Sequence, residues 1–354
     1  MQNKGVSFDH VFNRVMQDRE SKVDYFTPVN NLTALEDGSI TFKRRDLVAK
    51  GAGDKDVRLT TTSYADGQML GKLGMPAAYF RKAKDADPAL FAQHFNFWAQ
   101  RHKGDALLRT RDHGNGIASI RGIVSGAYSV LDNHEIMQML SRILDGSGAD
   151  YRIEGYTLDD HRFHMRITFP DLTKALGNLP NGTPDYNRVG MDLNNSEVGF
   201  SSFNLQAMIY RLICSNGLWG WGSDGEVFRQ RHAHLRRPEI QARAAEAMVT
   251  AARTGAEFLS EFEATQDQRI DNPFNAIKAI ARENNLSGTL TDTVLDNFEG
   301  DKNAYSVTNA FTRAARVLPN ERRIEVERLA GRLVRFTPTR WEKLSAIDVG
   351  EGAV

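Results

Sequence analysis

Cysteine is almost missing from this chain, which has 354 residues and a single thiol, Cys214. One thiol excludes an internal disulfide and every zinc site that is built from several cysteines. No base is marked in the sequence beside Cys214, so we interpret it as a buried structural thiol. The scarcity of cysteine is typical of a reducing compartment, and we expect a protein of the bacterial cytoplasm.

Long apolar runs and a surplus of charge are also missing. No apolar stretch reaches the roughly 18 residues of a membrane span, and the first residues lack the apolar core of a signal peptide. Lysine plus arginine and aspartate plus glutamate each total 45, so the formal net charge is zero. The case for an anionic partner must therefore rest on local patches of charge.

The signatures of cofactor binding and catalysis are absent as well. Gly51 and Gly53 begin like a dinucleotide fingerprint but no third glycine follows, and the HExxH pattern does not occur. We therefore predict no cofactor, no metal and no catalytic residues, and expect a protein that is not an enzyme. A hydrolase or nuclease whose metal ligands are dispersed along the chain is the alternative.

Two histidine pairs are candidate metal ligands. His161 and His164 are three apart, which places them on opposite faces of a strand. His232 and His234 would share a strand face, but no third ligand accompanies them. We interpret the second pair as solvated residues of a basic loop.

Hydrophobic periodicity predicts an α+β fold of strands and packed helices, followed by a helical C-terminal region. We divide the chain into an N-terminal extension (1–60), an α+β core domain (61–237), a helical region that packs on the core (238–340) and a tail (341–354). The clearest strand runs from Arg162 to Phe169, where apolar and polar residues alternate.

Shorter signals fill in the rest of the core domain. The pattern predicts strands at 106–111 and 116–124, and a loop at 177–187 that is rich in Gly, Pro and Asn. It predicts a helix at 131–144 with Asp132 or Asn133 as its cap. A long helix is expected to start at Pro238.

The clearest local charge is the run FRQRHAHLRR at residues 228–237, which contains four arginines and no acid. A phosphate backbone is the usual partner of such a run, and two tryptophans just upstream could stack on unpaired bases. The alternative is that the tryptophans anchor the core and the arginines form a solvated connector. The residues concerned are Trp219, Trp221, Arg229, Arg231, Arg236 and Arg237.

A second set of arginines lies on the predicted strands. Arg109 and Arg111 would share a strand face, and together with Arg121, Arg162 and Arg166 they could form a basic sheet surface. A solvated sheet face of mixed charge is the competing interpretation.

Three segments of the chain resemble a family of phage- and plasmid-encoded proteins known as a domain of unknown function. They are IRGIVSGAYSVLDNHEIMQML, GFSSFNLQAMIYRLICSNGLWGW and AYSVTNAFTRAARVLPNERRIEVERLAG, within a similarity that covers roughly residues 60–335. The most specific parts are R-x-I-V-S-x-x-Y-x-x-L-D-x-H from Arg121 to His134 and R-L-I-C-S-N-G from Arg211 to Gly217. The resemblance implies a home on mobile DNA, and it favours a strand over 204–214, where periodicity leaves the structure open.

The order of expected elements is also similar to the curved-sheet-plus-helix layout of single-strand annealing proteins, an analogy at the level of the fold. This resemblance implies a curved, largely antiparallel sheet with packed helices. Our main hypothesis is a DNA-binding protein that forms a homo-oligomer, favours single strands and acts in recombination or replication. Arg211 and the run at 228–237 would then bind phosphates. The alternative from another class is a module that captures a host protein, which would show a large exposed apolar patch.

Overall fold

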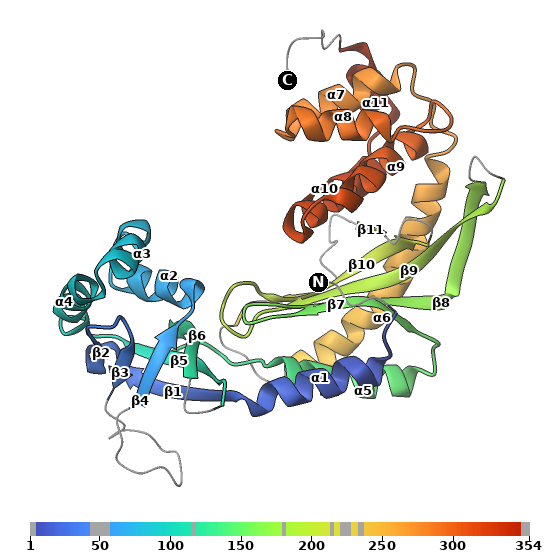
Figure 1. Ribbon diagram of the computed structural model, residues 1–354. Helices are drawn as coiled ribbons and strands as arrows, with labels where there is room; N and C mark the ends of the chain where they lie inside the picture. Colours follow the sequence, from blue (N-terminus) through green and yellow to red (C-terminus); the bar gives the residue numbers. More distant parts are fainter. Residues whose placement is uncertain are drawn as a thin grey trace.

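The structure is a computed structural model, and it describes residues 5–42, 57–114, 118–178, 182–212, 216–219, 228–232 and 237–347. The described residues form three bodies, which we name the N-terminal lobe, the central body and the helical region (Figure 1). Two of them are built on sheets and the third is built of helices alone, so the expected α+β class with a helical C-terminal region is confirmed.

The N-terminal lobe comprises β1 (Lys22–Pro28), η1 (Val29–Asn31), β2 (Leu32–Ala34), β3 (Ile40–Phe42), β4 (Val57–Thr61), α2 (Ser63–Lys72), α3 (Ala77–Ala86), α4 (Pro88–Ala99), β5 (Asp105–Asp112) and β6 (Ala118–Ser125). Its sheet has the strand order β1-β5-β6-β4-β3-β2, and only the pairing of β4 with β6 is parallel among the described strand pairs. Phe91, Phe95, Leu108 and Ile120 are fully buried in the core of this lobe.

The central body comprises α1 (Phe8–Glu20), α5 (Asn133–Ser147), β7 (Arg152–Leu158), β8 (Phe163–Asn178), β9 (Pro184–Asn195), β10 (Phe203–Arg211), β11 (Asn216–Trp219), β12 (Phe228–Gln230) and α6 (Arg237–Ala264). Its sheet runs β11-β10-β9-β8-β7, with β12 also paired to β10, and every described pairing is antiparallel. The sheet curls, and α1, α5 and α6 lie along one of its faces (Figure 1). This is the curved antiparallel sheet that the sequence predicts.

Helix α6 packs on the sheet through a stripe of small and apolar side chains. Ala244, Ala251 and Phe258 are fully buried, as expected for residues that recur at helical spacing. At Gly255 an added Cβ would lie only 2.4 Å from Cγ1 of Val189 on β9. The helix therefore approaches the strand more closely than any residue with a side chain would allow.

The helical region comprises α7 (Pro273–Glu283), α8 (Gly288–Asp296), α9 (Ala304–Ala314), η3 (Ala315–Val317), α10 (Asn320–Leu333) and α11 (Pro338–Ala346). Trp341, Phe311 and Leu333 form its buried core with residues of α6. Helix α10 approaches the face of the central sheet that α5 and α6 leave open (Figure 1), and it ties to that face by a buried ion pair between Glu327 and Arg166. The open face of the sheet is thus partly covered.

Most of the local expectations match the structure. The strand predicted from Arg162 to Phe169 is the first half of β8, and the helix predicted at 131–144 is α5. Asp132 and Glu135 close a capping box at the start of α5. The predicted loop at 177–187 is too long, because β8 continues to Asn178 and β9 begins at Pro184. The Gly, Pro and Asn residues of this hairpin hide the alternation of apolar and polar residues at the ends of its strands.

The expected N-terminal extension, 1–60, is divided between two bodies. Its described residues contribute α1 to the central body and β1 to β4 to the N-terminal lobe. Val11 and Val15 of α1 are buried against α5 and the central sheet. Within the described part of the chain, no helix combines the length and the apolarity needed to cross a membrane.

Candidate nucleic-acid interface

Four of the arginines expected to form a basic surface are buried. The exposed fractions of Arg109, Arg121, Arg166 and Arg211 are 1%, 1%, 2% and 5%. Each of them pairs with a carboxylate, so the expectation that they line an open positive surface is wrong. Burying an unpaired guanidinium would be very costly, and the folded chain avoids that cost by bringing carboxylates from distant elements.

Two of these arginines lie in the central sheet. Arg166 on β8 contacts Asp192 on β9, at 3.2 Å from Nε to Oδ2, and Glu327 on α10, at 2.6 Å from Nη2 to Oε2. Arg211 at the end of β10 forms a bidentate pair with Asp185. Both sets of contacts hold the helical region or a neighbouring strand against the sheet, and they leave these guanidinium groups little contact with solvent.

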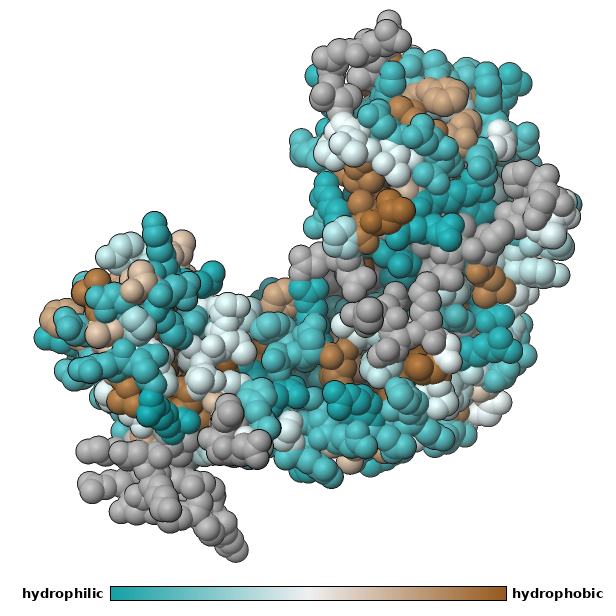
Figure 2. Space-filling model, in the orientation of Figure 1, coloured by the Kyte–Doolittle hydropathy of each residue, from teal (hydrophilic) through white to brown (hydrophobic). Residues whose placement is uncertain are grey.

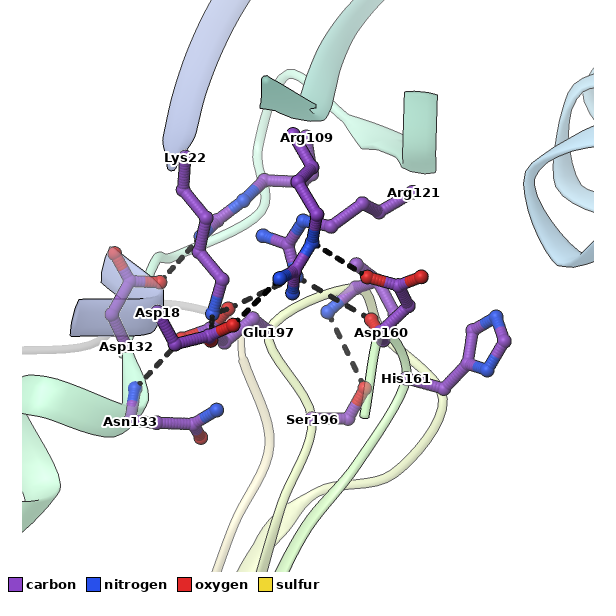
Figure 3. Close-up of polar contacts among 12 residues, drawn as sticks. Asp18, Lys22, Arg109, Arg121, Asp132, Asn133, Asp160, His161, Ser196 and Glu197 are labelled. Carbon is purple, nitrogen blue, oxygen red and sulfur yellow. Dashed lines mark hydrogen bonds and ion pairs between the residues drawn. The ribbon is translucent and has the colours of Figure 1, made fainter. Parts of the chain in front are cut away.

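The remaining sheet arginines meet between the N-terminal lobe and the central body (Figure 3). We call this charged cluster the ionic junction. Its pairs are Lys22 with Asp18 and Glu197, Arg109 with Asp24 and Asp132, Arg111 with Asp18 and Asp160, and Arg121 with Glu197. Arg109 and Arg111 therefore do turn to the same cluster, but it is filled with carboxylates.

Glu197 and Asp18 are the two buried carboxylates of the ionic junction, and Glu197 contacts two of its cations. Its Oε2 lies 2.7 Å from Nζ of Lys22 and 3.1 Å from Nη1 of Arg121, and its Oε1 accepts a hydrogen bond from the Asn133 amide at 2.9 Å. Burial alone would raise the pKa of Glu197, but Lys22, Arg121 and Arg109 outweigh it and lower that pKa to about 2. Glu197 is consequently a fixed negative charge at neutral pH.

Arg162, Arg229 and Arg231 have a different position from the buried arginines. Arg229 and Arg231 are exposed, and Arg162 is half-buried with its guanidinium 4.4 Å from the centre of the Phe200 ring. Phe200 has an exposed fraction of 43% and lines the same cavity as Arg229 and Arg231. Phe200 thus shares one cavity with two of the predicted arginines and packs against a third.

This cavity, which we call the junction groove, has a volume of about 500 Å³. The N-terminal lobe and the central body both line it, and none of the described lining residues is acidic. The lining residues are Gln68, Ile123, Val124, Ser125, Tyr128, Gly199, Phe200, Ser201, Ser202, Arg229, Arg231 and His232.

The turn before β10 presents Phe200 to the junction groove. Ser196 Oγ accepts hydrogen bonds from the amides of Val198 and Phe200, at 3.3 and 2.9 Å. Gly199 has a φ of +79°, which is strained for residues with a side chain. The turn therefore fixes the place of Phe200 through its backbone.

Tyr128 and His232 form the floor of the groove. Their rings stack with centroids 5.0 Å apart and an angle of 12° between the planes. Burial lowers the pKa of His232 and raises the pKa of Tyr128, so both rings are uncharged at neutral pH. The positive charge of the groove comes from its arginines.

The other predicted binding residues give less information. Trp219 pairs with Met208 between β11 and β10, and Arg237 begins α6, but their side chains are not described. Trp221 and Arg236 lie outside the described residues, as do Cys214 and His234. His164 contacts Asp192 at 2.6 Å, whereas His161 packs on Tyr64. The described residues contain no group of three or more His, Cys, Asp or Glu arranged to hold a metal ion.

Phe200 and Glu197 are the residues that sequence reasoning missed. Neither belongs to a periodic pattern, because both lie in the turn between β9 and β10. The run GFSSFN that contains Phe200 was a usable signal, since it is part of a segment that carries the family resemblance. A carboxylate such as Glu197 has no local signal, because its partners lie far away in sequence.

Residues 121–346 match the family model described as "Domain of unknown function (DUF932)". The chain belongs to the DUF932 family. The match covers more than half of the chain, and it includes the central body from α5 onward and the helical region. No curated protein and no solved structure matches the chain. The DUF932 name carries no function, so the proposal below is built on the geometry of the junction groove.

Proposed function

We propose that this DUF932 protein is a non-catalytic protein that binds single-stranded DNA in the junction groove, in recombination or replication of mobile DNA. The observation that carries the proposal is the position of Arg229, Arg231 and Phe200 around one cavity whose described lining has no acid. Arginine forks bind phosphates, and an exposed ring in the same cavity gives one base a surface to stack on.

The shape of the surroundings supports a strand more than a small molecule. The junction groove is open on one side, and a wide hollow between the N-terminal lobe and the helical region is rimmed largely by hydrophilic residues (Figure 2). A flexible single strand can follow such a surface with its phosphates in solvent. The neutral composition of the chain fits local binding of a few nucleotides.

The test is binding of a labelled single strand at several salt concentrations, measured by fluorescence anisotropy. The slope of log K against log salt should be about −0.7 for each phosphate contact. Replacing Arg229 and Arg231 together with alanine should flatten the slope by about 1.4 if each makes one contact. Arg142 on α5 and Arg253 on α6 are also exposed, and their double alanine variant is the matched control. If the wild-type chain does not bind at low salt, the proposal is wrong.

A protein partner is the second candidate, and α4 favours it. Phe97 and Trp98 have exposed fractions of 50% and 47%, and Leu90 on the same helix is exposed by 37%. Aromatic residues at this exposure are typical of protein interfaces. We propose that a second copy of the chain is the partner, which would make the protein a homo-oligomer. Light scattering should then show a smaller mass when Phe97 and Trp98 are replaced by serine, and an unchanged mass would contradict this candidate.

A further inference from the structure

The junction groove lies between two bodies that meet through charge. Gln68, Ile123 and Val124 of the N-terminal lobe form one wall, and Phe200 and Arg231 of the central body form the other. The width of the groove is therefore set by how these two bodies are placed. The chain passes between them at Ser21, after α1, and again between β6 and α5.

The cations and most of the carboxylates of the ionic junction belong to different bodies. All four cations belong to strands of the N-terminal lobe, with Lys22 on β1, Arg109 and Arg111 on β5, and Arg121 on β6. The carboxylates that meet them across the junction all belong to the central body, where they are Asp18, Asp132, Asp160 and Glu197. Asp24 is the exception, since it pairs with Arg109 inside the lobe.

Apolar packing does little to join these two bodies. The buried apolar cluster of the lobe runs from Val29 to Ile123 and contains no residue of the central body. The described packing across the junction consists mainly of Tyr64 of α2 on the rings of His161 and Phe200, with centroids 4.9 and 5.5 Å apart, and of Val198 against Gly122. The side-chain amide of Gln68 also donates a hydrogen bond to the carbonyl of Val198 at 2.8 Å. Interfaces of this polar kind permit relative movement of the two sides.

The ion pairs of the junction are incompletely matched. Nη1 of Arg109 and both Nε and Nη2 of Arg121 are buried without a hydrogen-bond partner among the described residues. A buried network with spare donors gains little net stability, because part of the desolvation cost of its charges is not recovered. Little free energy should then separate the closed arrangement from one in which solvent reaches the cations.

We propose that the ionic junction is a hinge that opens and closes the junction groove, and that screening or loss of its carboxylates swings the N-terminal lobe away. The opening uncovers the lysine and arginine face of β1, β5 and β6. As a regulator of binding the hinge rests on the proposed function, but the movement itself needs no nucleic acid.

The experiment measures the distance between the two bodies by energy transfer between dyes. Gln93 on α4 of the lobe and Glu246 on α6 of the central body are exposed, and Gln93→Cys and Glu246→Cys in a Cys214→Ser background provide the labelling sites. We expect transfer to fall as salt rises from about 0.05 M to about 1 M, because salt screens the partly exposed carboxylates Asp132 and Asp160. The buried pairs of Glu197 are screened much less, so the fall should be smaller than in the Asp160→Asn variant. Asp160→Asn should lower transfer at every salt concentration.

The matched control is Asp37→Asn, which removes an ion pair with Arg58 inside the N-terminal lobe. This variant should follow the wild-type curve. Circular dichroism at each salt concentration separates opening, which keeps the helical signal, from unfolding, which loses it. Constant transfer in the wild type up to about 1 M salt and in Asp160→Asn would overturn the hinge.

Binding of a labelled single strand tests separately whether the hinge moves and whether this movement regulates binding in the junction groove. If Asp160→Asn opens the junction and also changes the affinity for the strand several-fold, the hinge regulates the groove. If it opens the junction while the affinity stays unchanged, the hinge stands and its regulatory role is wrong. If no variant binds a strand at all, only the proposed function fails.

Discussion

Arg166 on β8 and Glu327 on α10 are joined by a buried ion pair although 161 positions separate them in the chain. Glu327 is fully buried, and its second oxygen contacts Nε of Arg323 at 2.9 Å. Asp192 and Glu327 both favour the charged form of Arg166 against the effect of burial, so the pKa of Arg166 is raised. This pair fixes the helical region to the polar face of the central sheet.

Replacing Glu327 with glutamine should destabilise the fold strongly. The change leaves the buried guanidinium of Arg166 with one carboxylate, and breaking a buried pair costs about 3 to 5 kcal/mol. The free energy of unfolding from urea denaturation gives the value. Glu325→Gln is the control on the same helix, because its pair with Arg322 is exposed and should cost less than about 1 kcal/mol. Equal losses in both variants would contradict the role of the Arg166 pair.

The lowered pKa of Glu197 predicts how the stability of the fold depends on pH. The pKa of this carboxyl in the folded chain is about 2, below its ordinary value of 4.5, so the folded state binds the proton less tightly than the unfolded state. Its contribution is complete above about pH 4.5 and is lost as the pH falls toward about 2, with a maximum of about 3 kcal/mol.

Urea denaturation of the wild type and of Glu197→Gln at several pH values between 6 and about 2.5 isolates this contribution. The wild type should lose more stability than the variant over the acid window, because the other carboxylates titrate in both. Parallel curves for the two proteins would show that Glu197 does not carry the effect.

Phe200→Ala should weaken binding of a single strand by about 1 to 3 kcal/mol, the usual contribution of one stacked base. The measurement is anisotropy with an intact strand and with a strand of the same length that lacks its bases. The loss should appear with the intact strand and disappear with the abasic one. Phe274→Ala removes a ring of similar exposure, 50%, on α7 and should not change the affinity.

Gly190→Ala should destabilise the central sheet. An added Cβ would lie 2.4 Å from the backbone oxygen of Ile167 on the neighbouring strand, so β8 and β9 would have to separate. Overpacking of this kind costs about 1 to 3 kcal/mol or more. Gly146 on α5 has no neighbour within 4 Å of an added Cβ, and Gly146→Ala should instead stabilise by up to about 1 kcal/mol. The readout is the shift of each variant's thermal midpoint from that of the wild type. A midpoint for Gly190→Ala at the wild-type value would contradict the prediction.

Local patterns in the sequence predicted several elements between residues 106 and 264, but they did not predict α1 or β1 to β4 within residues 1–61. The alternation from Arg162 to Phe169 and the capping residue Asp132 both follow from the chain's nearest neighbours, and both elements are present. The burial of Arg166 could not be predicted in the same way. Period-two alternation places it on the face away from the apolar core, but α10 returns from far along the chain to cover that face.

The same limit applies to the candidate site. The run at 228–237 was visible from its charge, and Arg229 and Arg231 are indeed exposed. Arg109 and Arg121 have the same residue type in strands, yet they meet carboxylates that only the folded chain brings near. The sequence therefore shows where arginines cluster along the chain. Whether an arginine is exposed to a ligand depends on contacts between distant segments, which the sequence does not show.

The family match begins at Arg121, which lies inside strand β6 (Ala118–Ser125). A recombinant fragment cut at that boundary would start halfway along a strand and would lack both neighbours of that strand, β4 and β5. It would also lack Asp18, Lys22, Arg109 and Arg111. Glu197 would then lose its ion pair with Lys22 and keep only the pair with Arg121, the first residue of the fragment. Studies of this protein should therefore express the chain from before α1, because the boundary seen by comparison of sequences is not a boundary of folding.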